Sequence, residues 1–233
     1  MNTKIVRYIL CRMLGVEAAL LLVPVLVAVI YQEKCGIVFL IPIVILCLLF
    51  FVAGRKRPEH GQIYGKEGMV IVALAWILWS LFGAMPFTLS GYIPSYVDAF
   101  FETVSGFTTT GSSIIPDVEV LPHCLLFWRS FTPWIGGMGV LVFVLVVTSL
   151  DRKNSMHLMR AEVPGPEKDK LVPKAMSTAR ILYGMYLILT VIEMVFLVIG
   201  GMNLFDSMIF SFGSAGTGGF SNYADSVAHF NSA

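Results

Sequence analysis

The sequence predicts an all-α polytopic membrane protein. Of its 233 residues, 57% are hydrophobic and only 13% are charged, whereas about a quarter of the residues in an ordinary soluble domain are charged. The apolar residues lie in blocks, several of them as long as the roughly 20 residues of helix that cross a bilayer. The first block is too long for the apolar region of a signal peptide. The blocks are about 8–31, 36–53, 68–89, 123–150 and 176–200.

The charged residues are distributed unevenly among the connections. Lysine and arginine gather at the N-terminus, between the second and third blocks, and between the fourth and fifth, whereas 90–122 and 201–233 contain neither. Connections rich in these residues tend to stay cytoplasmic. We therefore expect the N-terminus and the loops 55–67 and 151–175 to be cytoplasmic. We expect no nucleic-acid partner, because the basic side chains alternate sides with the spans.

No cluster of residues suggests covalent chemistry. The four histidines are dispersed, and the sequence has no Walker A lysine and no G-x-S-x-G elbow. The four cysteines have no C-x-x-C spacing, so we expect free apolar side chains rather than a metal site or a disulfide framework. We expect neither an enzyme nor a covalently bound cofactor. The cysteines are Cys11, Cys35, Cys47 and Cys124.

The segment 91–122 has to begin and end on the same side of the membrane, because the blocks around it run in opposite directions. Its first part, "VDAFFETVSGF", is apolar enough to enter a bilayer and too short to cross it. This predicts a re-entrant helix over about 95–107, followed by an irregular limb, "TTTGSS", over 108–113. Irregular backbone is tolerated at membrane depth where protein buries it or where it lines a water-filled cavity. A plain surface loop is the alternative.

A similar segment follows 108 residues later. "DAFFETVSGFTTTGSS" aligns with "DSMIFSFGSAGTGGFS", which predicts a second re-entrant helix over about 204–215 and a second limb over 216–221. Internal repetition of this kind indicates a repeated assembly, although two copies can also match by chance. The identical pairs are Asp98 with Asp206, Thr109 with Thr217, Gly111 with Gly219, and Ser113 with Ser221.

Such loops can bind a monovalent cation. A helix that enters the membrane directs its C-terminus, with about half a negative charge, at the membrane centre. Carbonyl oxygens of the following limb can replace the hydration shell of the ion. Asp98 and Asp206 are interpreted as helix N-caps, with recruitment of cations as the alternative.

The chain resembles the Trk/Ktr/HKT superfamily of potassium transporters, most closely the bacterial Trk-type membrane subunit. The segments that carry this resemblance are "DAFFETVSGFTTTGSS", "LPHCLLFWRSFTPWIGGMG", "MHLMRAEVPGP" and "AGTGGFS". The resemblance implies four membrane–pore-loop–membrane repeats, as in potassium channels, preceded by two extra transmembrane helices. The implied divisions are 1–54 for the extra helices, 68–150 for the first repeat and 176–233 for an incomplete second repeat.

The resemblance also implies a selectivity filter that transports potassium. A serine in place of the first-repeat glycine goes with sodium transport in this superfamily, so Gly111 favours potassium. Potassium would bind through Thr109, Thr110, Thr217 and Gly218. The implied filter residues are Thr109, Thr110, Gly111, Thr217, Gly218 and Gly219.

Further expectations concern the surroundings of the protein. The resemblance implies the bacterial cytoplasmic membrane with its lipid, a homodimer, and a cytosolic nucleotide-binding regulatory subunit that docks near 160–170. Two pore loops are half of the family's four, so we expect either a truncated or fragmentary chain or half of a split transporter. A non-conducting scaffold or regulatory remnant is the alternative function.

Two charged residues near the first limb are candidates for supporting the filter. Glu102 lies in the predicted re-entrant helix, and Arg129 lies one to two turns into the fourth block. Each is costly in hydrocarbon when unpaired. We hypothesise that they pair behind the filter; snorkelling of Arg129 to the outer interface is the alternative. Glu193, in the fifth block, has no assigned role.

Overall fold

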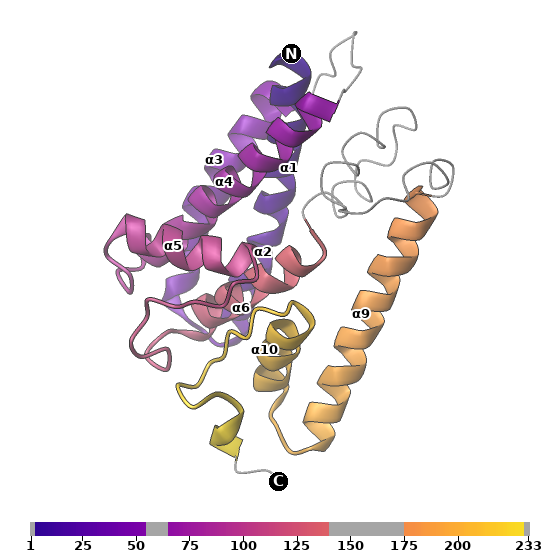
Figure 1. Cartoon of the computed structure of the whole chain (residues 1–233). Helices are drawn as coiled ribbons and strands as arrows, with labels where there is room; N and C mark the ends of the chain where they lie inside the picture. Colours follow the sequence, from indigo (N-terminus) through magenta and orange to yellow (C-terminus); the bar gives the residue numbers. More distant parts are fainter. Residues whose placement is uncertain (1–2, 55–64, 140–174, 231–233) are drawn as a thin grey trace.

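The computed structural model describes residues 3–54, 65–139 and 175–230, and this part of the chain contains helices and no strand (Figure 1). The expected cytoplasmic loops 55–67 and 151–175 fall largely or wholly outside the described residues, as does 160–170. The helices are α1 Thr3–Leu20, α2 Leu22–Ile30, η1 Lys34–Phe39, α3 Leu40–Leu49, η2 Phe50–Gly54, α4 Gly65–Leu89, α5 Tyr96–Phe107, α6 His123–Gly137, α9 Ala175–Ile199, α10 Leu204–Ala215 and η3 Ser226–Phe230.

Four helical stretches are long and apolar enough to cross a membrane. They correspond to four of the five blocks predicted from the sequence, and the helical membrane class is confirmed. The remaining block, the fourth at 123–150, begins with α6, and its residues from 140 onward lie outside the described part. The four stretches are Thr3–Ile30, Lys34–Gly54, Glu67–Leu89 and Arg180–Ile199.

Proline explains the interruption of the first stretch. Helices α1 and α2 are separate elements on either side of Leu21, with Pro24 in the first turn of α2. Proline has no backbone N–H and its ring clashes with the carbonyl four residues earlier, here Leu20, so the helix is disturbed at this point. The sequence pattern alone did not predict this break.

The two short helices α5 and α10 pack on opposite sides of α6 (Figure 1). α5 also contacts α4, and α10 also contacts α9. The C-terminal end of α5 is enclosed by aromatic rings, because Phe107 lies edge-on to Trp79 and to Trp128. The Trp128 indole N–H donates to the Gly83 carbonyl at 2.9 Å. α6 is therefore the shared support of both short helices.

Helix α9 differs from the rest of the described chain in its surroundings. Only 6% of its membrane-length window is buried, and large apolar side chains such as Phe196 and Ile199 are exposed. A helix that is apolar all round is typical of a hydrocarbon environment. This exposure agrees with the membrane class.

Candidate functional site

The limb after α5 turns back on the end of that helix through its backbone N–H groups. Thr109 N donates to the Gly106 carbonyl at 2.9 Å, and Thr110 N donates to the Ser105 carbonyl at 2.9 Å. Gly111 N donates to the same Ser105 carbonyl at 3.4 Å. The three N–H groups are thus all used at the helix C-terminus.

The limb after α10 has the same bonds 108 residues later. Thr217 N donates to the Ser214 carbonyl at 2.9 Å, and Gly218 N and Gly219 N both donate to the Gly213 carbonyl at 3.0 Å. Each acceptor in this loop aligns with the corresponding acceptor in the first. The two segments therefore share a backbone course, and not only four identical residues.

The backbone angles repeat as well. Thr109 and Thr217 have φ of 56° and 57°, and Gly111 and Gly219 have φ of 74° and 69°, while the residue between each pair is not in the left-handed region. Alternation of right- and left-handed residues gathers successive N–H groups on one side of the chain. Among the described residues, no backbone hydrogen bond outside the helices ends on a carbonyl oxygen of 109–111 or 217–219.

One part of this pattern is ordinary helix-ending chemistry. Left-handed C-terminal caps with bonds to the last helical carbonyls are common. A threonine with positive φ is uncommon, however, and here it occurs at the same place in both loops. Glycine at 111 and 219 readily adopts positive φ, but nothing in the sequence indicated left-handed threonines at 109 and 217.

The two loops touch at the positions predicted to form the filter. A Cβ placed on Gly111 would lie 1.9 Å from the Gly218 carbonyl oxygen, and one placed on Gly218 would lie 2.5 Å from the Pro133 Cβ. Thr110 and Gly219 are exposed, and Thr109 is half-buried. The structure thus brings the two predicted groups of residues together beside α6.

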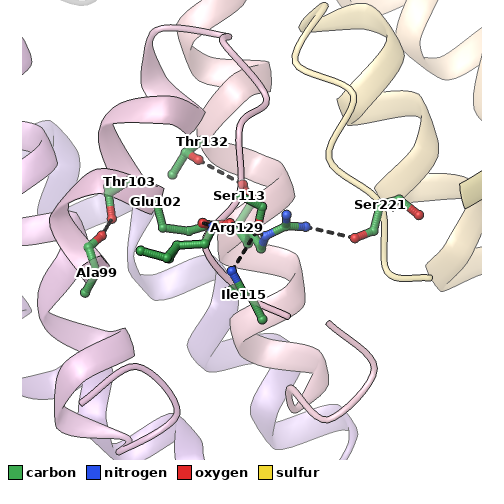
Figure 2. Close-up of polar contacts among 9 residues, drawn as sticks. Ala99, Glu102, Thr103, Ser113, Ile115, Arg129, Thr132 and Ser221 are labelled. Carbon is green, nitrogen blue, oxygen red and sulfur yellow. Dashed lines mark hydrogen bonds and ion pairs between the residues drawn. The ribbon is translucent and has the colours of Figure 1, made fainter. Parts of the chain in front are cut away.

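Glu102 and Arg129 form a buried ion pair between α5 and α6 (Figure 2). The Arg129 Nε lies 2.6 Å from the Glu102 Oε1, and their side chains are 4% and 0% exposed. Glu102 also accepts hydrogen bonds from the Ser113 hydroxyl at 3.0 Å and from Ile114 N at 2.9 Å. Arg129 does not snorkel to the interface, since its guanidinium lies inside the protein.

Arg129 also reaches the second loop. Its Nη1 donates to the Ser221 carbonyl at 2.8 Å (Figure 2), and its guanidinium carbon lies 3.9 Å above the centre of the Phe220 ring. Ser113 and Ser221 occupy the same place in the two copies. One arginine therefore connects the end of the first limb, through Glu102, with the end of the second.

Within α6, a side-chain hydrogen bond to the Arg129 carbonyl replaces the backbone bond that Pro133 cannot make. Pro133 has no N–H with which to bond the carbonyl four residues earlier, which is that of Arg129. The Thr132 hydroxyl donates to this carbonyl instead, at 2.8 Å. The backbone acceptor of a buried turn is thereby satisfied.

The N-cap interpretation of the two aspartates is wrong. The caps are Ser95, whose hydroxyl accepts from Asp98 N at 3.4 Å, and Asn203, whose side-chain oxygen accepts from Asp206 N at 2.8 Å. The aspartates lie within the first turn. The spacings S-x-x-D and N-x-x-D, which resemble a capping box, could have shown this in the sequence.

Asp206 takes part in a polar network that the sequence did not predict. Its carboxylate accepts hydrogen bonds from the side-chain amides of Asn203 and Asn222 and from the Tyr223 hydroxyl. Asn222 and Tyr223 follow the second limb directly. Among the described residues, no group of three or more His, Cys, Asp or Glu side chains is arranged to hold a metal ion.

Comparisons with known proteins show the family to which the chain is similar. The profile of the TrkH family, described as cation transport protein, matches residues 36–233. The Trk system potassium uptake protein TrkH of Escherichia coli K12 is 37% identical over 222 residues, which are 91% of this chain and 44% of that protein. TrkG of the same strain, also a Trk system potassium uptake protein, is 36% identical over 99% of this chain and 49% of its own length.

A solved structure is similar over the whole chain. The crystal structure of the potassium transporter TrkH from Vibrio parahaemolyticus superposes with a TM-score of 0.80 and 32% identity, covering 100% of this chain and 47% of that one. The chain spans just under half the length of these relatives, which are transporters and not enzymes. The chain belongs to the TrkH family of cation transport proteins.

Proposed function

We propose that this chain forms part of a pathway for potassium uptake across the bacterial cytoplasmic membrane. The observation that carries the proposal is the pair of matched loops, in which the N–H groups of 109–111 and 217–219 are bound to helix ends. The carbonyl oxygens of these residues are then available to a cation. Relatives described as potassium uptake proteins support potassium as the ion.

The proposed chemistry is replacement of water by backbone oxygen. The C-termini of α5 and α10 lie directly before the two limbs, and their partial negative charge favours a cation there. Carbonyls of Thr109, Thr110, Thr217 and Gly218 would coordinate potassium, and the two glycines at 111 and 219 would permit the left-handed turn. No covalent step is required.

We propose that Glu102 and Arg129 hold both limbs in place. Glu102 binds the backbone N–H of Ile114, just after the first limb, and Arg129 binds the carbonyl of Ser221, the last residue of the second. Because both charges are buried, each depends on the other to offset its desolvation. The pair would thus fix the separation of the two walls without itself touching the ion.

The arrangement in the membrane follows from the charge distribution. We propose a cytoplasmic N-terminus, re-entrant entry of α5 and α10 from the outer side, and lipid around the exposed face of α9. A homodimer and a cytosolic nucleotide-binding subunit follow from the family resemblance alone and stay predictions. A non-conducting scaffold remains the competing function.

Rubidium uptake in cells deficient in potassium transport tests the proposal. Two forms are expressed: the chain alone, and the chain joined to the remaining half of Escherichia coli TrkH. The second form is needed because the chain spans just under half of that relative. We expect uptake from the joined protein. No uptake from either form would favour the scaffold.

Selectivity tests the filter assignment. Gly111→Ser in the joined protein is expected to raise sodium uptake relative to rubidium, since its Cβ would press on the Gly218 carbonyl. Gly91→Ser is the matched control, because Gly91 also has positive φ, 81°, but open space around it. An unchanged ion ratio in Gly111→Ser would contradict the assignment of this residue.

A further inference from the structure

Helix α1 carries a fully buried carboxyl group, that of Glu17. The residue is 0% exposed, and neither of its carboxyl oxygens has a hydrogen-bond partner in the part of the chain that the structure describes. Glu17 lies well inside the candidate span Thr3–Ile30. An ionisable side chain within a membrane span is rare and costly, and it marks a candidate functional site. The proposed potassium pathway gives Glu17 no role.

The neighbours of Glu17 on its own helix are apolar. Met13 and Leu21 lie one turn before it and one turn after it on the same face of the helical stretch, and they are 1% and 0% exposed. α1 packs beside α3 and α4 (Figure 1), whose fully buried side chains include Leu46 and Trp79. Neither Met13 nor Leu21 can share a proton with the carboxyl group.

The titratable side chains of α1 and of the elements packed against it cluster away from Glu17 along the sequence. The packed elements are α2, η2, α3 and α4, and all but one of these side chains lie in the first ten residues of α1 or the first three of α4. Besides Glu17 they are Lys4, Arg7, Tyr8, Cys11, Arg12, Cys47, Lys66 and Glu67.

Two of the groups that could approach Glu17 are committed elsewhere. Arg12 donates from Nη1 to the Tyr8 hydroxyl at 3.0 Å. Tyr96 of α5 interacts electrostatically with Glu17, but its hydroxyl donates to the Leu81 carbonyl at 2.7 Å. The carboxyl group of Glu17 is therefore left without a donor.

Glu102 shows what a buried carboxylate needs in this chain. It is as buried as Glu17, but it has the Arg129 Nε at 2.6 Å and hydrogen bonds from Ser113 and Ile114. Burying a charged carboxylate without such partners costs far more than burying a neutral acid, and a group in that position takes up a proton instead. The burial and isolation of Glu17 thus favour the protonated form.

We propose that Glu17 is a proton-binding site inside the membrane. It holds a proton as a neutral carboxylic acid while α1 packs against α3 and α4. It passes this proton to water, leaving a carboxylate, only when the packing opens. An unsatisfied buried polar group lowers stability, and natural proteins commonly give up stability at functional positions.

Infrared spectroscopy of the full 233-residue chain in lipid bilayers tests the site. Every sample carries Glu193→Gln, because Glu193 also lies in a candidate span. At neutral pH we expect the carbonyl stretching band of a protonated carboxylic acid, at the high frequency of a carboxyl group without a hydrogen bond. Glu17→Gln should remove this band. Glu102→Gln is the matched control and should leave it, because the equally buried Glu102 is ionised by its pairing with Arg129.

Transfer from H2O to D2O tests the release of the proton, since exchange lowers the frequency of the band. Exchange in Met13→Ala should be at least about tenfold faster than in the parent, because truncating a buried methionine weakens the packing by more than the roughly 1.4 kcal/mol that corresponds to this factor. Leu26→Ala is the control, at a position that is 61% exposed, and should leave the rate unchanged.

Glu17→Met provides a second variant should Glu17→Gln fail to fold. Methionine fills a similar volume without a polar atom, so this variant should lack the band and resist unfolding at least as well as the parent. A clear loss of stability in Glu17→Met would show that the carboxyl group has a partner and would overturn the proposal.

The spectra can contradict the proposal in two further ways. Absence of the band at neutral pH, or a band at the lower frequency of a hydrogen-bonded carboxyl group, would overturn the isolated neutral acid. Equal exchange rates in the parent and in Met13→Ala would overturn release through opening of the packing. None of these measurements involves ion uptake, so failure of the proton site leaves the proposed transport standing.

Discussion

The loops after α5 and α10 share one backbone course and anchor it with different side chains. After α5, the following chain is held by Glu102, which lies in the middle of that helix and binds Ser113 and Ile114. After α10, the position equivalent to Glu102 is Phe210. The anchor there is Asp206, in the first turn, which binds Asn222 and Tyr223.

This difference shows which features the turn depends on. The turn itself is made by main-chain bonds to the helix end, so it needs little beyond glycine and small residues. The chain beyond the turn has no such local partner and is held by a buried acid, which comes from the middle of the helix in α5 and from the first turn in α10. Arg129 couples the two segments, because it bonds Glu102 of α5 and the Ser221 carbonyl after α10.

The largest loss of stability is expected from replacing Arg129, whose guanidinium bonds both loops. Arg129→Met leaves the Glu102 carboxylate buried and uncompensated, which should lower the free energy of unfolding by about 3–5 kcal/mol. Glu102→Gln/Arg129→Met should cost less than Arg129→Met alone, because no unpaired charge remains. Unfolding in detergent measures both, and Arg12→Met, at a half-buried arginine that donates to Tyr8, serves as control. Equal losses from the single and the double variant would contradict ion pairing.

The two turn glycines are expected to differ in tolerance. Alanine at either position meets the left-handed backbone, at about 1–2 kcal/mol. Gly111→Ala should cost about 1–3 kcal/mol more, since its Cβ collides with the Gly218 carbonyl, whereas Gly219 has open space around it. Unfolding of the two variants side by side measures this. Equal stability would mean that the loops do not touch as described.

Replacing Asp206 should lower stability more than replacing Asp98, because Asp206 accepts hydrogen bonds from Asn222 and Tyr223. Asp206→Ala leaves Asn222 and Tyr223 without their acceptor and should cost about 1–3 kcal/mol. Asp98→Ala, at the equivalent half-buried position of α5, should stay within about 0.5 kcal/mol. Thermal unfolding distinguishes them, and a larger loss from Asp98→Ala would show that the first loop has an anchor at the same place.

The smallest effects are expected at the helix caps. Asn203→Ala should cost about 1 kcal/mol, because its oxygen accepts from Asp206 N at 2.8 Å. Ser95→Ala should cost less, since the corresponding distance is 3.4 Å. Hydrogen exchange of the first turns of α10 and α5 reports each cap locally. Faster exchange in α5 than in α10 after these changes would reverse the ranking.

Local signals made much of the fold predictable. The apolar blocks and the positions of the two short helices follow from hydropathy and from the repeated aspartate, small residues and glycine. The family resemblance is confirmed by the profile match and by the relatives. The break at Leu21 was missed because one proline inside a long apolar block leaves the hydropathy unchanged.

The site was less predictable where backbone atoms act as partners. Pairing of Glu102 with Arg129 was foreseeable, since both charges lie in apolar sequence. The Ser221 carbonyl was not, because every residue carries a carbonyl and nothing in the sequence marks the one that a guanidinium will bind. The same holds for the contact of Gly111 with Gly218, which depends on how α5 and α10 each pack on α6.

We propose that the carbonyls of 109–111 and 217–219 face the transported ion. An experimental structure of a transporter that contains this chain, with thallium in place of potassium, tests it most directly. The account predicts anomalous density in contact with carbonyl oxygens of both loops and none at the Glu102 carboxylate. Thallium bound at acidic side chains, with both sets of carbonyls left uncoordinated, would contradict it.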